Sequence, residues 1–184
     1  MIHACNDLTH AHVPATLDRR GFLKTALAGM GLAAVGLSGF GQIVRAAGGT
    51  DAMLLSCMDY RLMDDVVKYM DGRKMKDKYD HVILAGASLG AQTDKYPAWG
   101  RTFWDHLGVA LELHHIKKVI VMDHRDCGAY KVFLGTDFGK DPKAETEIHA
   151  KHLKSLASAI KSKHSSLEVE LLLMDLKGKV EKIG

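Results

Sequence analysis

The chain has 184 residues, of which 47% are hydrophobic and 26% are charged, and its 25 basic and 22 acidic residues give a formal net charge of +3 with the histidines neutral. This length suits one domain with a sizeable core. The near balance of charge excludes a strong field of one sign, so we expect no nucleic-acid partner.

The first 46 residues are expected to be an export signal. The segment Asp18–Lys24 has the twin-arginine form, and small residues at Ala46-Ala47 suit cleavage. Between them, 25–40 is an uncharged stretch of 16 residues, which falls short of the ~20 apolar residues that a spanning helix needs. We therefore expect a removed signal, the twin-arginine translocase as a partner during export, a periplasmic location and no stable membrane insertion.

The remaining residues, 47–184, are expected to form a single domain. Four of the basic and two of the acidic residues lie in 1–46, so the net charge of this domain falls to +1. Its short apolar runs alternate with amphipathic runs, which is typical of a mainly parallel sheet between helices. The expected elements are strand 52–57, helix 63–69, strand 81–85, turn 86–90, helix 99–114, strand 119–123, helical turn from 128, helix 144–164, strand 169–174 and strand 180–183.

These elements predict a three-layer α/β/α fold with a mainly parallel four-stranded sheet and a short C-terminal edge strand. The strand over 119–123 is apolar on both faces, as buried parallel strands are. The long helix over 144–164 is expected to turn Ile148, either His152 or Leu153, Leu156 and Ile160 inward. His149 and His152 are interpreted as part of its solvated face, and the adjacent His114 and His115 cannot easily share a metal ion.

Two polar segments follow two of the predicted strands. They are Cys57-Met58-Asp59-Tyr60-Arg61 and His124-Arg125-Asp126-Cys127. Because sites in open parallel sheets gather at the carboxyl ends of strands, these segments can converge. Two thiolates and one imidazole are ligands that tetrahedral Zn²⁺ prefers, and a fourth position is left for water. The sequence therefore predicts that 47–184 is a zinc-binding α/β catalytic domain.

Two other interpretations of the cysteines remain open at this point. In an oxidising compartment Cys57 and Cys127 could form a disulfide. Alternatively, Cys127 could be a nucleophilic thiolate with His124 as its base. Zinc is favoured because each cysteine lies in a polar cluster at a strand end.

The two segments resemble the zinc site of the β-class carbonic anhydrases, which is built from a CxDxR segment and an HxxC segment commonly followed by glycine, here Gly128. The resemblance extends over about 51–184. It implies one Zn²⁺ per chain bound by Cys57, His124 and Cys127, with Asp59 and Arg61 as a catalytic ion pair beside it.

The resemblance also implies an activity. A zinc-bound hydroxide would interconvert CO₂ and bicarbonate, in a homodimer or higher homo-oligomer. Where the family often has Arg-Asn-Ala-Gly-Asn, this chain has Ile83-Leu84-Ala85-Gly86-Ala87-Ser88, and Gly86, Ala87 and Gly128 are expected to line the substrate pocket. Because that stretch departs from the family, two alternatives stay open: a carbonyl sulfide or carbon disulfide hydrolase of the same fold, and a non-catalytic zinc-binding protein.

Overall fold

The computed structural model describes residues 49–184, so the expected signal over 1–46 lies outside the described residues. Within the described part, no helix is long and apolar enough to cross a membrane. The elements are β1 Ala52–Ser56, η1 Tyr60–Leu62, α2 Met63–Gly72, β2 Tyr79–Ile83, η2 Gly90–Gln92, α3 Pro97–His114, β3 Lys118–His124, α4 Gly128–Leu134, η3 Phe138–Lys140, α5 Pro142–Lys163, β4 Glu168–Met174 and β5 Val180–Lys182.

The five strands form one sheet in the order β2-β1-β3-β4-β5. The first four are mutually parallel, and β5 is an antiparallel edge strand. Strand β1 is central to the site, because its last residue, Ser56, is opposite Ile83 of β2 and Met122 of β3. The predicted mainly parallel sheet with a short C-terminal edge strand is confirmed.

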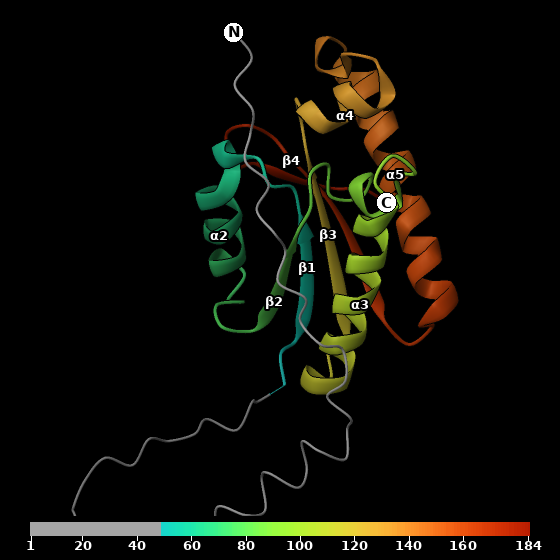
Figure 1. The fold of residues 1–184 in the computed structure, drawn as a ribbon. Coiled ribbons are helices and arrows are strands. Elements are labelled where there is room, and N and C mark those ends of the chain that lie inside the picture. Colours follow the sequence, from blue (N-terminus) through green and yellow to red (C-terminus); the bar gives the residue numbers. More distant parts are fainter. Residues whose placement is uncertain (1–48) are drawn as a thin grey trace, which may run out of the picture. The chain divides into compact units, whose positions relative to one another are not determined.

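Helices cover both faces of this sheet (Figure 1). On one face, Phe103 and Leu107 of α3 and Leu153 of α5 are fully buried in one apolar cluster. On the other face, Val66 and Met70 of α2 pack in a second cluster against β1, β3 and β4. Since burying one such side chain contributes about 1.5–3 kcal/mol, these two clusters hold the three layers together.

The boundaries of β2 differ from the prediction. The strand begins at Tyr79 and ends at Ile83, two residues earlier than expected at each end. Gly86 has φ +77° and Ala87 has φ +38°, a conformation that no strand adopts. The chain therefore leaves the sheet at Leu84 and turns over the carboxyl end of β1, next to the predicted metal ligands.

Candidate metal centre

The topology brings the two predicted ligand segments together. Cys57 directly follows β1, His124 ends β3, and Cys127 closes the short loop after it. One side-chain donor atom from each of these three residues lies within 4.8 Å of the other two. Among the described residues this is the one such group of three potential metal ligands.

The spacing of the two sulfur atoms suits a metal. The Sγ atoms of Cys57 and Cys127 are 4.0 Å apart, close to the separation of about 3.8 Å that two thiolates take on a tetrahedral zinc with Zn–S bonds of about 2.3 Å. Neither cysteine is part of a disulfide. The alternative of a Cys57–Cys127 disulfide, which needs an S–S distance of about 2.05 Å, is therefore wrong for this structure.

His124 presents a nitrogen without a protein partner. Its Nδ1 donates to the carbonyl oxygen of Arg125 at 2.8 Å, which leaves the lone pair on Nε2. Within residues 49–184 that Nε2 atom is buried and makes no hydrogen bond. A buried unpaired acceptor is costly, and an imidazole whose other nitrogen is held by a backbone carbonyl is the arrangement typical of a metal ligand. The donor set therefore fits a zinc ion.

The two thiols share one proton in the absence of a metal. The pKa of Cys57 falls to about 4, because the Cys127 thiol donates a hydrogen bond to it and because His124 and the N–H of Gly86, 3.2 Å from Sγ, stabilise the thiolate. The pKa of Cys127 is raised above its usual range by the same hydrogen bond and by burial. A dication would favour the doubly ionised pair.

Asp59 and Arg61 form the expected ion pair beside the centre. Nη2 of Arg61 lies 2.7 Å from Oδ2 of Asp59, and Nε lies 2.9 Å from Oδ1. This bidentate contact is the main reason that the pKa of Asp59 falls to about 2. Oδ2 of Asp59 also lies 3.8 Å from Nε2 of His124. The carboxylate is therefore ionised and lies at the border of the candidate metal position.

An open groove of about 730 Å³ leads to the thiols of Cys57 and Cys127. Asp59 and Arg61 contribute polar groups to its lining, and much of the wall is apolar. The apolar wall residues are Met58, Tyr96, Trp99, Val132 and Phe133. Tyr96 stacks on Trp99 with ring centroids 4.4 Å apart, so this wall is a packed aromatic surface rather than a loose loop.

The three residues expected to line the substrate pocket lie in different places. Gly128 lines the groove, together with Ala85. Gly86 contacts Cys57 through its N–H. Ala87 is fully buried and packs in the apolar cluster with Phe103. The local turn therefore places Ala87 behind the site.

A family model described as "Putative carbonic anhydrase" matches residues 47–184. The chain belongs to this carbonic anhydrase family. Two curated relatives are uncharacterized proteins of Rickettsia. One, from Rickettsia conorii, is 42% identical over 131 residues, covering 71% of this chain and 70% of that protein. The other, from Rickettsia bellii, is 40% identical over 131 residues, covering 71% of this chain and 80% of that protein.

Solved β-carbonic anhydrases share the fold. A tetrameric enzyme from Sordaria macrospora is similar with a TM-score of 0.50 and 10% identity, covering 74% of this chain and 82% of that chain. The wild-type CafD enzyme from Aspergillus fumigatus gives a TM-score of 0.51 and 13% identity, covering 74% of this chain and 90% of that chain. At these identities the likeness shows the β-carbonic anhydrase fold alone, and the predicted fold is confirmed.

Behind the centre, this carbonic anhydrase family member has a buried polar cluster that sequence reasoning missed. Oδ2 of Asp123 accepts hydrogen bonds from Ser88 Oγ at 2.7 Å, Tyr130 OH at 2.6 Å and His149 Nδ1 at 2.9 Å, and Oδ1 accepts from Ser88 N at 2.9 Å. The interpretation of His149 as solvated is wrong, since only 1% of it is exposed. An acidic residue inside an apolar strand was the available signal, because a buried carboxylate needs partners.

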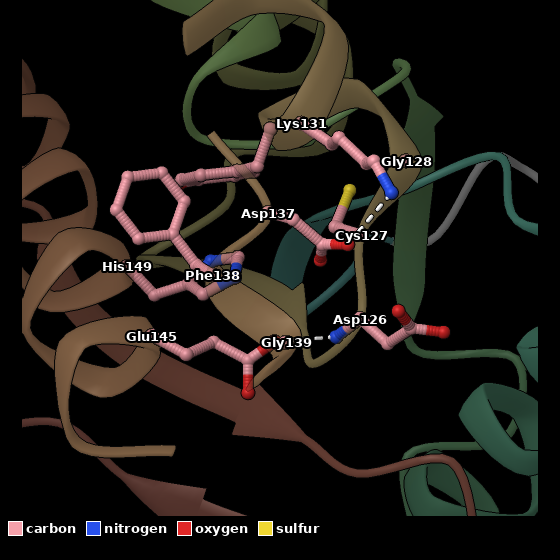
Figure 2. A pocket seen from close by; sticks show the side chains of 10 residues that line it. Asp126, Cys127, Gly128, Lys131, Asp137, Phe138, Gly139, Glu145 and His149 are labelled. Atoms are coloured by element: carbon pink, nitrogen blue, oxygen red, sulfur yellow. Dashed lines mark hydrogen bonds and ion pairs between the residues drawn. The ribbon is translucent and has the colours of Figure 1, made fainter. Parts of the chain in front are cut away.

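A small cavity of about 30 Å³ lies beside residues 126–128 and is shown in Figure 2. His149, Glu145 and Cys127 contribute to its lining. In Figure 2 the carboxylate of Glu145 accepts a hydrogen bond from the N–H of Asp126, at 2.6 Å. Helix α5 therefore supports the loop between His124 and Cys127, although the sequence pattern of this helix pointed to an apolar contact face alone.

Proposed function

We propose that this chain is a zinc-dependent carbonic anhydrase that interconverts CO₂ and bicarbonate. The observation that carries the proposal is the buried, unpartnered Nε2 of His124, which faces two thiols 4.0 Å apart and lies 3.8 Å from an ion-paired Asp59. Membership of the carbonic anhydrase family and the shared fold support it.

Different residues of the site would bind the metal, accept a proton and hold a ligand in place. When bound by Cys57, His124 and Cys127, the zinc ion would lower the pKa of a coordinated water toward neutrality and thereby supply a nucleophile for CO₂. Asp59, ionised and held by Arg61, is placed to accept a proton and to orient the nucleophile. The N–H of Gly86 holds the Cys57 sulfur. Because two thiolates reduce the charge on the metal, activity should rise toward alkaline pH.

The open groove supports two further parts of the proposal. Its apolar wall suits an apolar substrate such as CO₂. Met58, Tyr60 and Val132 beside the site are respectively 63%, 86% and 67% exposed, and a contiguous exposed apolar surface marks an interaction site. We therefore propose a homodimer or higher homo-oligomer in which a second copy covers this surface; the Sordaria macrospora enzyme is a tetramer.

The deciding experiment is stopped-flow CO₂ hydration by the zinc-loaded full chain at pH about 7 and about 8.5, values that bracket the ionisation expected for a thiolate-ligated zinc water. Turnover that rises with pH and is lost in Cys57→Ala is the expected result. The matched control is Glu112→Gln, an exposed carboxylate at the end of α3 farther from Trp99, which should keep full activity. Bound zinc without turnover at either pH would favour the non-catalytic zinc-binding alternative.

A second candidate activity uses the same groove. Carbonyl sulfide and carbon disulfide are apolar triatomic substrates, and the aromatic wall of Tyr96, Trp99 and Phe133 would bind them as well as CO₂. Product analysis separates the two activities, because only the sulfur substrates release sulfide. Sulfide production faster than CO₂ hydration would replace the anhydrase proposal.

The export expectation also stands as a proposal. We infer that Arg19 and Arg20 direct the chain through the twin-arginine translocase to the periplasm. Cell fractionation with the pair changed to lysine tests this proposal. Retention of the variant in the cytoplasm, with the unchanged chain in the periplasm, is the expected result.

A further inference from the structure

We propose that Asp126 is a positioning residue, which anchors Arg61 from the second ligand loop and so holds Asp59 away from the metal position. The proposal rests on the proposed zinc site. It concerns a residue that lies between the two HxxC ligands and takes no part in the zinc chemistry proposed above. Asp126 binds no metal in this proposal; it acts only through Arg61.

The contacts show that one guanidinium joins the two ligand segments. Arg61 uses Nε and Nη2 on the Asp59 carboxylate. It uses Nη1 on Oδ2 of Asp126, at 2.8 Å, and Nη2 on the carbonyl oxygen of Asp126, at 3.0 Å. The two acidic residues therefore occupy different edges of the planar guanidinium group, and each fixes its orientation for the other.

Asp126 is itself held in place, although its side chain is 56% exposed. Its φ of +54° is left-handed, and its N–H donates to the buried carboxylate of Glu145 at 2.6 Å, as Figure 2 shows. Glu145 is held in turn by Arg125, with Nη1 to Oε2 at 3.0 Å. A surface acid in a flexible loop would not have this support.

The exposure of the Asp126 side chain indicates that its ion pair orients Arg61 and adds little to the stability of the fold. An ion pair this exposed contributes about 0–1 kcal/mol to folding. Arg61, however, lies on the three-residue helix η1, and its long side chain has many rotamers to lose. Without Asp126, Asp59 would be its one remaining side-chain partner among the described residues. Oδ2 of Asp59 then has only the 3.8 Å gap to His124 Nε2 to close before it reaches the metal position.

The test uses the full chain loaded with Co²⁺, whose visible absorption bands report the ligands of the metal. Azide is the added probe, because a small anion binds where the fourth position is open. Asp126→Asn is the main variant, since asparagine accepts a left-handed φ. Asp126→Gly is a second variant that tolerates the same backbone. Asp137→Asn is the matched control, because Asp137 lines the small cavity and pairs with Lys131 but does not touch Arg61.

We expect azide to change the bands of the wild type and of Asp137→Asn. In both Asp126 variants its affinity should fall by up to about fivefold, the factor that corresponds to losing one exposed ion pair. Adding Asp59→Ala to Asp126→Asn should restore the response, because no carboxylate then closes the site. Equal azide affinity in wild type and both Asp126 variants would overturn the proposal, as would a wild type that does not respond. The two proposals can fail separately. If the cobalt form follows this azide pattern but the zinc form does not hydrate CO₂, the proposed function is refuted and the role of Asp126 stands.

Discussion

Nδ1 of His149 lies 2.9 Å from Oδ2 of Asp123, and each of the two residues is 1% exposed. The pair joins helix α5 to the end of β3, one residue before His124. The same carboxylate holds Ser88, in the loop that also carries Gly86, and Tyr130, in the helix that follows Cys127. One buried acid therefore connects three segments around the candidate metal centre.

Replacing this acid should be strongly destabilising. Asp123→Ala leaves Ser88, Tyr130 and His149 with buried donors that have lost their acceptor, and breaking a buried pair of this kind costs about 3–5 kcal/mol. Urea unfolding of the metal-free full chain measures the change. The control Asp94→Ala, at an exposed position, should lie within about 0.5 kcal/mol of wild type. A loss below about 1 kcal/mol for Asp123→Ala would show that the cluster is not holding the fold.

Zinc binding should release protons. In the metal-free site the pKa of Cys127 is raised, so its thiol is protonated near neutral pH. The pKa of His124 is raised as well: burial lowers it, but the negative charge of the nearby Cys57 thiolate favours the protonated imidazole and outweighs burial. Since only deprotonated ligands bind, we expect about one proton or more to be released per zinc near pH 7.

Calorimetry in buffers of different ionisation enthalpy measures this release. The number should fall as the pH rises and more of the His124 side chain is already neutral. Cys127→Ser, which removes the protonated thiol, should release fewer protons and bind zinc more weakly. Proton release that is the same in this variant and in the wild type would contradict the shared-proton description of the thiols.

The Asp59–Arg61 pair should make a small contribution to the free energy of unfolding that is lost at acidic pH. Because Arg61 lowers the pKa of Asp59 to about 2, below the value of about 3.9 for an unfolded chain, the contribution is complete above about pH 4 and is lost as the pH falls toward 2. Solvent at the mouth of the groove screens the pair and keeps its contribution below about 1 kcal/mol.

Urea unfolding of the metal-free chain at pH about 5 and about 2.5 tests this expected loss of stability, because the two values lie on either side of the Asp59 titration. Asp59→Asn should lose less stability than the wild type over this interval. If Asp59→Asn lost more stability than the wild type, the expected direction would be wrong, because folding would then raise the pKa of Asp59 instead of lowering it.

Two glycines should respond oppositely to alanine. A Cβ at Gly90 would lie 2.3 Å from the carbonyl oxygen of Ala85, so Gly90→Ala should displace the loop that carries Gly86 and destabilise the protein. A Cβ at Gly108, in helix α3, meets nothing within 4 Å. Gly108→Ala should stabilise by about 0.5–1 kcal/mol, because it lowers the entropy of the unfolded chain. Thermal unfolding of both variants measures the two changes in stability. A Gly90→Ala variant as stable as the wild type would show that the loop can move to accept the added Cβ.

Local patterns in the sequence were sufficient for the elements and for the group of three potential metal ligands. Hydrophobic periodicity depends on residues three or four apart in a helix and two apart in a strand, and it located each helix and strand to within a few residues. The Cys57 and His124–Cys127 segments could be recognised because metal ligands must be of particular residue types. The boundaries of β2 were less accurate, because the turn at Gly86 and Ala87 depends on how the loop packs.

The sequence by itself therefore determined the α/β class, the parallel sheet and the three thiol and imidazole groups of the centre. Only the tertiary structure decided that His149 contacts Asp123, 26 residues away, and that Arg61 contacts Asp126, 65 residues away. The physical reason is the range of the interactions. Apolar periodicity and residue type can be read from near neighbours, whereas the partner of a buried acid or of a guanidinium group is chosen by whichever donor or acceptor the folded sheet and helices bring within 3 Å.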